Sequence, residues 1–188
     1  LQTLHVESWF LFLPDPDDGR FALSNLTPLS NLTKLRVLSL AGCQIEDISP
    51  IAGLSSLNNL SLSQNAISQI PDLSALTNLS NLSLDQNQIT EIGGLAGLSP
   101  IYYLDLSDNQ IVDISALSTI NSTFENSVSF NLRDNQITDL QPLLSLSDLD
   151  QIDVRDNPLS EVSIETHIPA LVQDSVTVLF VAPGGEEV

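Results

Sequence analysis

Basic residues are scarce in this sequence, and the shortage limits the partners that the chain can bind. Five lysines and arginines stand against 24 aspartates and glutamates, which gives the 188 residues a formal charge of −19 at pH 7. Such an excess of negative charge repels the phosphates of nucleic acids and of anionic membranes. We therefore expect no nucleic-acid partner, and either a partner with a basic surface or a role of the charge in solubility alone.

Cysteine, histidine and long apolar stretches are also rare. Cys43 is the single cysteine, which excludes a disulfide within the chain, and the two histidines, His5 and His167, stand near opposite ends of it. The sequence has no glycine-rich phosphate loop and no run of about eighteen apolar residues. These absences argue against an enzyme, and we expect no catalytic residue, no cofactor, no metal site and no membrane insertion.

What the sequence does contain is a repeat with a strict period. LNNLSLSQNAISQI begins at Leu57, LSNLSLDQNQITEI at Leu79 and IYYLDLSDNQIVDI at Ile101, so the period is twenty-two. A repeat of this length is typical of a solenoid, in which each unit buries its apolar edge against its neighbours. Six units of the pattern LxxLxLxxNxIxxI can be aligned, and they begin at Leu35, Leu57, Leu79, Ile101, Ser127 and Leu149.

The period is interrupted in two places. The step from Ile101 to Ser127 is longer by four than the other steps, which places four extra residues within the stretch 121–126. Before the first unit comes an irregular coil that contains the insertion LPDPDDGR. In that coil Leu1, Leu4 and Val6 fit the LxxLxL positions, and Trp9 takes the place of the asparagine.

The C-terminal end is expected to cover the apolar core of the last repeat. The sequence predicts a short helix from about Ile164 to Val172 and a strand from Val176 to Val181. The covering side chains are expected to be Ile168, Leu171, Val178 and Phe180. We predict one domain over residues 1–182, made of the irregular first coil (1–34), six repeats (35–160) and a helix–strand cap (161–182), with 183–188 as a linker to a further domain.

Alternation within each repeat predicts a short strand with its leucines turned inward. In NLSLDQN, Leu82 and Leu84 share one face, and Asn81, Ser83 and Asp85 share the other. Successive strands are expected to form a parallel sheet on the concave face of an α/β-type solenoid. Proline and glycine recur on the convex side and favour short turns or 3₁₀ segments there, at Ser49-Pro50, Pro71-Asp72, Gly93-Gly94 and Gln141-Pro142.

One column of residues stands where the chain leaves each strand. An asparagine amide at this point can both donate to and accept from turn peptides that would otherwise be buried and unpaired. We therefore predict a structural ladder, in which a buried cysteine thiol replaces the first amide. Its members are Cys43, Asn65, Asn87, Asn109, Asn135 and Asn157.

Two groups of mostly acidic residues have more than one interpretation. The first is the column Asp47, Gln69, Glu91, Asp113, Asp139 and Glu161, for which capping of the following turn is favoured over bound cations. The second is DPDDG at Asp15 to Gly19. It lacks the full spacing and the distal glutamate of a calcium loop, so a solvated turn is favoured there over calcium binding.

The solvent face of the predicted sheet changes character along the chain. The first three units present mostly small, neutral side chains there, such as Ser39, Ser61 and Ser83. The later units present eight residues that we call the C-terminal patch: Tyr103, Asp105, Asp108, Arg133, Asp134, Asp153, Arg155 and Asp156. Tyrosine and arginine often anchor interfaces, so the patch predicts a partner-binding site. The alternative is that the arginines only neutralise neighbouring aspartates.

The repeats QIEDISPIAGLSSLNNLSL and QITEIGGLAGLSPIYYLDLSDNQIVDISAL resemble the leucine-rich repeats of bacterial internalin-type surface proteins. The resemblance covers about residues 23–160 and extends, more distantly, to the phosphatase-regulating leucine-rich repeats of eukaryotes. It implies a leucine-rich repeat horseshoe whose concave face holds a protein of a host or neighbouring cell. The chain departs from the internalin pattern at its ends, which show neither the N-terminal helical cap nor an immunoglobulin-like inter-repeat domain.

Our leading hypothesis is a non-enzymatic binding module of a bacterial surface or secreted protein, hence extracellular. Its partner would be a protein, or alternatively a glycan, and a monomer is favoured. Two alternatives remain open. In the first alternative, the chain is a structural spacer in a surface stalk. In the second, it is an intracellular regulatory subunit that resembles the phosphatase-regulating class.

Overall fold

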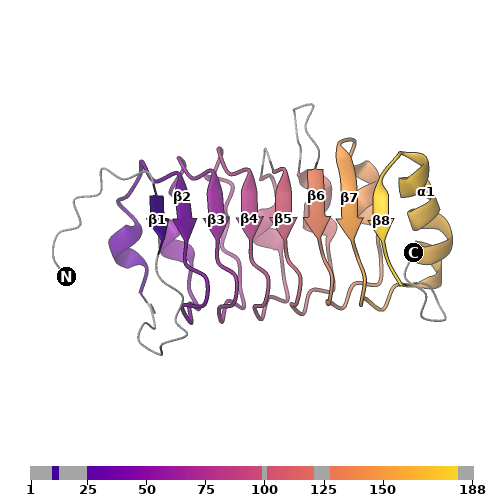
Figure 1. Ribbon diagram of the computed structural model, residues 1–188, viewed down its shortest axis with the longest axis horizontal. Helices are drawn as coiled ribbons and strands as arrows, with labels where there is room; N and C mark the ends of the chain where they lie inside the picture. The colour runs from indigo at the N-terminus through magenta and orange to yellow at the C-terminus, as the bar shows by residue number, and fades with distance from the viewer. Residues whose placement is uncertain (1–9, 13–24, 99–100, 121–127, 182–188) are drawn as a thin grey trace.

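The computed structural model describes residues 10–12, 25–98, 101–120 and 128–181. Eight parallel strands form one sheet in these residues, and their order in the sheet follows the sequence (Figure 1). The strands are β1 (Phe10–Phe12), β2 (Val37–Ser39), β3 (Asn59–Ser61), β4 (Asn81–Ser83), β5 (Tyr103–Asp105), β6 (Val128–Asn131), β7 (Leu149–Asp153) and β8 (Thr177–Leu179). The predicted leucine-rich repeat solenoid is therefore confirmed.

The strands pair in the register that the period predicts. Val37 pairs with Asn59, and Asn59 with Asn81, which are equivalent positions of successive repeats. Tyr103 pairs with Ser129, a step longer by four than the regular one, so the four extra residues fall between β5 and β6. The stretch 121–126, to which the sequence assigned them, lies outside the described residues.

The prediction for the first coil is wrong in its register. The alternation of Leu4 and Val6 placed the strand of this coil between these residues, but the strand that pairs with β2 is β1, at Phe10–Phe12. The stretch 9–13 is apolar at every position, so it offers no alternation from which a register could be read. Residues 1–9 lie outside the described part of the chain.

Leucine and isoleucine side chains fill the space between the sheet and the back of the solenoid. Leu60, Leu82 and Leu104, at the centres of β3, β4 and β5, are all buried. Burying one such side chain contributes about 1.5–3 kcal/mol. Leu26 is buried as well, and Leu29 packs against the same core, as do Ile48 and Ile51 at the same spacing in the next repeat.

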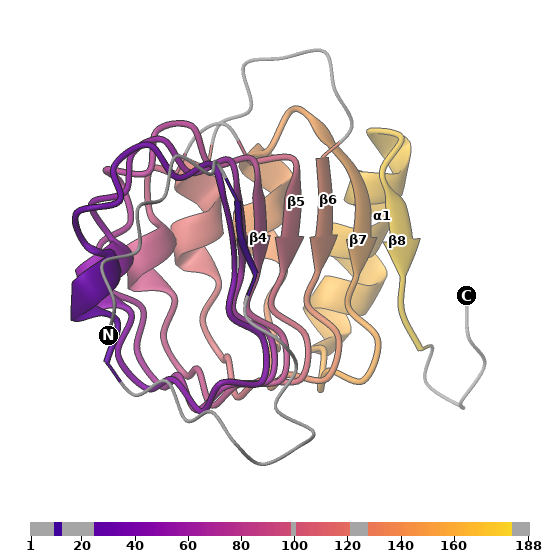
Figure 2. The same cartoon turned by 60° about the vertical axis from the view of Figure 1, so that its left-hand side comes forward.

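The back of the solenoid consists of short 3₁₀ turns, as predicted. Figure 2 shows them on the side of the molecule opposite the strands. They are η2 (Thr27–Leu29), η3 (Ser49–Ile51), η4 (Gly93–Leu95), η5 (Ser115–Thr119) and η6 (Gln141–Ser145). Proline stands at the start of η2, η3 and η6, where its missing N–H is not needed. The segment after Pro71 forms turns without a helix.

A helical segment closes the C-terminal end of the sheet (Figure 1). A π-helical turn, η7 (Ser163–His167), continues into the α-helix α1 (Ile168–Gln173), and β8 follows. Ile168, Leu171 and Val178 are buried, and Phe180 packs against the core. The helix occurs where the sequence predicted it, whereas β8 is shorter than the predicted strand. None of the helices in the described residues is long and apolar enough to span a membrane.

The asparagine column joins adjacent repeats through hydrogen bonds. Asn87 accepts the N–H of Ile67 at its Oδ1 (3.0 Å), and its Nδ2 lies within 3.1 Å of the carbonyl oxygens of Leu62, Leu84 and Asp85. The same arrangement recurs at Asn65, Asn109, Asn135 and Asn157. Each amide therefore satisfies peptide groups of its own repeat and of the preceding one.

Cys43 takes the first position of this column. Its thiol is buried and lies 3.4 Å from the carbonyl oxygen of Ala41. Its own N–H donates to Oδ1 of Asn65 in the next repeat (3.0 Å). The cysteine is thus part of the packed interior.

Candidate functional site

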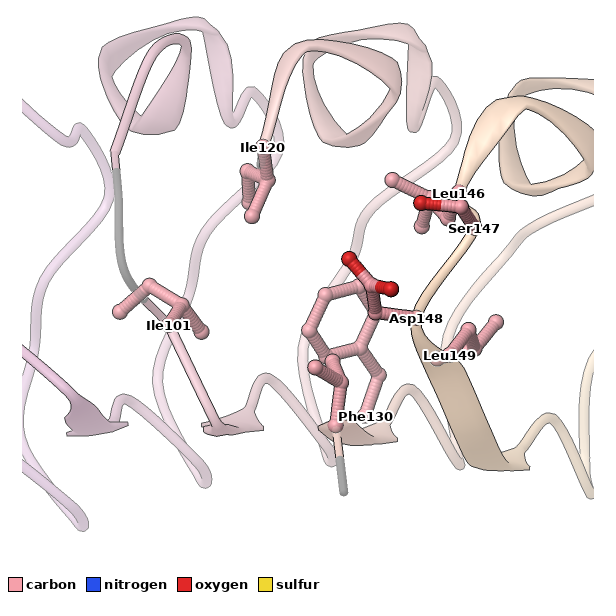
Figure 3. A pocket seen from close by; sticks show the side chains of 8 residues that line it. Ile101, Ile120, Phe130, Leu146, Ser147, Asp148 and Leu149 are labelled. Carbon is pink, nitrogen blue, oxygen red and sulfur yellow. The ribbon is translucent and has the colours of Figure 1, made fainter. Parts of the chain in front are cut away.

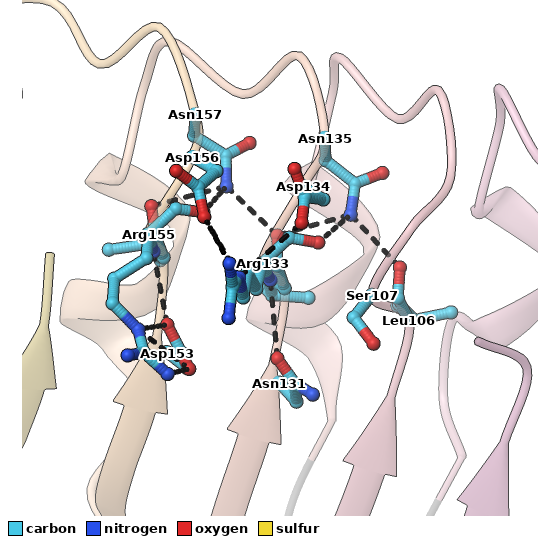
Figure 4. Close-up of polar contacts among 12 residues, drawn as sticks. Leu106, Ser107, Asn131, Arg133, Asp134, Asn135, Asp153, Arg155, Asp156 and Asn157 are labelled. Atoms are coloured by element: carbon cyan, nitrogen blue, oxygen red, sulfur yellow. Dashed lines mark hydrogen bonds and ion pairs between the residues drawn. The ribbon is translucent and has the colours of Figure 1, made fainter. Parts of the chain in front are cut away.

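The C-terminal patch occupies the solvent face of β5 to β7 and the turns that follow β5, β6 and β7. Tyr103 and Asp105 belong to β5, and Asp153 ends β7. Arg133 and Arg155 lie just beyond the ends of β6 and β7 (Figure 4). The parallel sheet brings together residues from three repeats because equivalent positions of adjacent strands lie side by side.

The three remaining aspartates of the patch share a backbone conformation. Asp108, Asp134 and Asp156 have φ of 53°, 52° and 57°, which is the left-handed region. Earlier repeats carry Gly42, Gln64 and Gln86 at this point, also with positive φ. Glycine, asparagine and aspartate tolerate this region best, so these aspartates have a structural role in the turn that the sequence reasoning missed. Gly42, in the same column, is the sequence signal for this role, because glycine favours positive φ.

Tyr103 is held in place by Asp105. The phenol donates to Oδ2 of Asp105 (2.8 Å), and Nδ2 of Asn131 donates to the same oxygen (3.2 Å). Oδ1 of Asp105 accepts the backbone N–H of Ser107 (3.0 Å) and its hydroxyl (2.6 Å). Asp105 therefore has four donors and acts as a support for the tyrosine ring, which is 39% exposed.

Burial and the contact with Asp105 make the Tyr103 phenol harder to ionise than a free tyrosine. Partial burial raises the pKa of Tyr103 to about 12, and the hydrogen bond to Asp105 and the negative charges of Asp105 and Asp85 add to the rise. The ring is thus neutral at physiological pH. It presents a fixed aromatic surface to solvent beside several carboxylates.

The two arginines of the patch are paired within the protein. Arg155 binds Asp153 of its own repeat, with Nε 3.0 Å from Oδ1 and a terminal nitrogen 2.6 Å from Oδ2. Arg133 reaches across to the next repeat, where Nε and a terminal nitrogen each lie 2.8 Å from Oδ2 of Asp156 (Figure 4). Nε of Arg133 is also 3.4 Å from Asp134. The interpretation that the arginines neutralise neighbouring aspartates is therefore supported, although the Arg133 side chain stays 44% exposed.

Asp108 lies among other carboxylates. Partial burial raises its pKa, the charges of Asp134, Asp85 and Asp105 raise it further, and Arg133 lowers it. Asp85, which the sequence reasoning left out of the patch, accepts a hydrogen bond from the hydroxyl of Ser63 (2.5 Å). Negative charge on this face therefore begins one repeat before Tyr103.

Known leucine-rich repeat proteins match both the sequence and the fold. The family described as Leucine Rich repeats (2 copies) matches residues 33–75, 55–97 and 77–119. The crystal structure of internalin C2 from Listeria monocytogenes is similar, with 35% identity and a TM-score of 0.71 over 84% of this chain. This chain is a leucine-rich repeat protein of the internalin-like class.

A second crystal structure, internalin F from Listeria monocytogenes, gives the same result. The internalin-like chain is 31% identical to it, with a TM-score of 0.71 over 86% of the chain. The chain spans 66% of internalin C2 and 45% of internalin F. Among curated proteins, no sequence matches it.

One serine, one histidine and one aspartate of the internalin-like chain meet at the C-terminal cap, but not as a catalytic triad. Nδ1 of His167 lies 3.3 Å from Oγ of Ser163 and 3.3 Å from Oδ1 of Asp139. A triad needs the serine and the aspartate on opposite ring nitrogens. Ser163 is fully buried and bonds to the peptides of Thr138 and Leu140. The group therefore joins the cap to the last repeat.

Aspartates on the back of the internalin-like solenoid cap the turns that follow them. Oδ1 accepts the N–H of the residue next but one in three pairs: Asp47 with Ser49 (2.8 Å), Asp113 with Ser115 (2.7 Å) and Asp139 with Gln141 (2.9 Å). The hydrogen bonds from Ser49 lower the pKa of Asp47. The predicted capping is confirmed for these three. The candidate calcium loop, Asp15 to Gly19, lies outside the described residues.

A cavity lies under β6 of the internalin-like solenoid, beside the point where the period is interrupted. Ile101, Ile120, Phe130 and Leu149 are among the residues that line it (Figure 3). Phe130 stands at a position that holds leucine in the preceding repeats. The cavity has a volume of about 20 Å³, which is room for a single water molecule. This cavity is therefore too small for a metabolite or a cofactor.

Proposed function

We propose that the internalin-like chain is a non-enzymatic recognition module of a bacterial surface or secreted protein, and that it binds a protein partner through the C-terminal patch. Leucine-rich repeat proteins are protein-interaction scaffolds, which supports the general role. We infer that the C-terminal patch is the binding surface from the contrast between the early and the late repeats. β2 to β4 present small neutral side chains and asparagine to solvent, whereas β5 to β7 present a tyrosine and charged groups.

The exposed ring of Tyr103 is the observation that carries this proposal. Aromatic side chains bury a large apolar area at an interface. A ring that is already fixed by a hydrogen bond to Asp105 loses little conformational freedom on binding, so more of the contact energy appears as affinity. We expect Tyr103 to be the central contact.

Exposure sorts the residues of the patch by role, because Asp105, Asp153 and Arg155 are half-buried and the others are exposed. Asp105, Asp153 and Arg155 are engaged with one another or with Tyr103, so we assign them to support. The exposed residues are assigned to direct contact with the partner: Tyr103, Asp108, Arg133, Asp134 and Asp156. A variant of a supporting residue should therefore disturb binding through the residue that it holds.

The proposal can be tested by capture of proteins released from the surface of host or neighbouring cells. The variant Tyr103→Ala/Arg133→Ala removes both exposed anchors. A matched control is Val162→Ala/Val172→Ala, because these valines are 58% and 55% exposed on the C-terminal cap, away from the patch. The first variant should lose the captured protein, and the control should keep it, with both unfolding at the same urea concentration as the wild type.

Two other results would count against the proposal. Equal capture by the wild type and the Tyr103→Ala/Arg133→Ala variant would remove the patch from the binding surface. Absence of any captured protein would favour the structural spacer. Removing glycans enzymatically from the released proteins separates the remaining alternative, because a glycan partner would then be lost while a protein partner would still be bound.

A further inference from the structure

The solvent face of the sheet carries charge at one end only. β2, β3 and β4 contribute no charged residue to it. From the turn after β4 onward, six carboxylates lie on or beside this face: Asp85, Asp105, Asp108, Asp134, Asp153 and Asp156. Arg133 and Arg155 oppose them, so the formal balance of these eight residues is four negative charges.

Internal pairing does not remove this excess. Each arginine binds one aspartate closely, Arg155 with Asp153 and Arg133 with Asp156. Asp85 and Asp105 have hydrogen bonds from neutral donors, which orient a carboxylate but leave its charge in place. Partial burial raises the pKa of Asp108, and the nearby charges of Asp134, Asp85 and Asp105 raise it further.

Tyr103 adds an aromatic surface to the charged face. Its phenol bonds to Asp105, so the exposed ring is next to a carboxylate that accepts hydrogen bonds from neutral donors. A cation over a tyrosine ring is attracted by the electrons of the ring, and a nearby carboxylate strengthens the attraction. The face thus combines two features that favour the same kind of group.

We propose that the partner meets β5 and β6 with lysine or arginine side chains, carried on a basic protein segment that crosses these strands beside Tyr103. This inference rests on the proposed binding function and adds the chemistry of the partner. A neutral or acidic partner would have to remove water from the carboxylates without replacing it by positive charge, which is costly. A basic segment supplies that charge and is attracted over a distance.

The test uses a library of random short peptides displayed on phage and selected on the immobilised chain. The variant Asp108→Asn/Asp134→Asn removes two charges from the face, and asparagine tolerates the positive φ of both positions. The control Asp47→Asn/Asp72→Asn removes the same amount of charge from exposed turns away from the sheet. We expect the selected peptides to be rich in lysine and arginine. They should bind the first variant about tenfold more weakly than the wild type. They should bind the control as tightly as the wild type.

Other outcomes separate this inference from the proposed function. Peptides that need Tyr103 but carry no excess of lysine or arginine would overturn the inference and leave the binding function in place. Equal weakening by both double variants would also overturn it, because the attraction would then come from the total charge. Selected peptides that are indifferent to Tyr103→Ala would contradict the binding site itself. Tight Ca²⁺ binding lost only in Asp108→Asn/Asp134→Asn would assign the carboxylates to a metal ion and overturn the inference.

Discussion

Gly94 should be the least replaceable glycine on the back of the solenoid. A Cβ at this position would lie 2.2 Å from the carbonyl oxygen of Pro71 and 2.3 Å from that of Ile70, both in the preceding repeat. Real Cβ atoms essentially never come closer than 3.0 Å to such atoms. The neighbour is backbone, so a flexible side chain cannot move aside, and Gly94→Ala must push two repeats apart.

The expected loss can be estimated from the contacts at this point. Overpacking in a well-packed interior costs about 1–3 kcal/mol. The hydrogen bond from the N–H of Leu73 to the carbonyl oxygen of Gly94 (3.0 Å) would also be strained, and such a bond contributes about 0.5–1.5 kcal/mol. We therefore expect Gly94→Ala to lower the free energy of unfolding by about 1.5–4.5 kcal/mol.

Gly93 provides the matched control. A Cβ there would meet no atom within 4 Å, and the residue begins the 3₁₀ turn η4. Gly93→Ala should therefore stabilise the chain by about 0.4–1 kcal/mol through the unfolded state. Urea unfolding followed by circular dichroism measures both variants. A Gly94→Ala protein as stable as Gly93→Ala would refute the close approach of the two repeats.

Three further predictions concern the ladder and the patch. Asn109→Ala leaves peptide groups of Ile89, Leu84 and Leu106 without their partner and should cost about 2–3 kcal/mol in urea unfolding, whereas the exposed Gln110→Ala should change stability by less than about 0.5 kcal/mol. In a Tyr102→Phe background, ultraviolet titration should show Tyr103 ionising with a pKa of about 12, and Asp105→Asn should move that pKa toward 10.0; an unchanged pKa would remove Asp105 as a cause. The folded-state pKa of Asp108 lies above its ordinary 3.8, so charging this carboxyl destabilises the fold as pH rises past that value. Asp108→Asn should therefore raise the free energy of unfolding at pH 7, by less than about 1 kcal/mol because solvent screens the group, and give no gain at pH 3; an equal gain at both pH values would trace the effect to the backbone instead.

The repeats could be predicted from the sequence because one period determines the strand, the face and the neighbours of each residue. A leucine such as Leu82 fixes its strand, its face and its neighbours, since the same position recurs in each regular repeat. That information was absent in the first coil, where the run 9–13 is uniformly apolar. Its strand was therefore placed at Leu4 and Val6 instead of at Phe10–Phe12.

The candidate site was predictable in composition but not in its internal contacts. The period shows that Arg155 and Asp153 share a face, but the choice between a partner and each other depends on side-chain rotamers that no periodicity encodes. The roles of Asp108, Asp134 and Asp156 in the turn were readable in principle. Gly42 stands in their column, and glycine is the residue that positive φ favours most.

The central claim is that the solvent face of β5 to β7 binds the partner, and site-specific photo-cross-linking tests it most directly. A photoreactive phenylalanine replaces Tyr103 in one protein and Val172, on the exposed side of α1, in another. Each is incubated with proteins from the surface of host or neighbouring cells and irradiated. We expect a discrete cross-linked protein from position 103 and none from position 172. The same product from both positions, or a product from position 172 alone, would contradict the assignment of the binding surface.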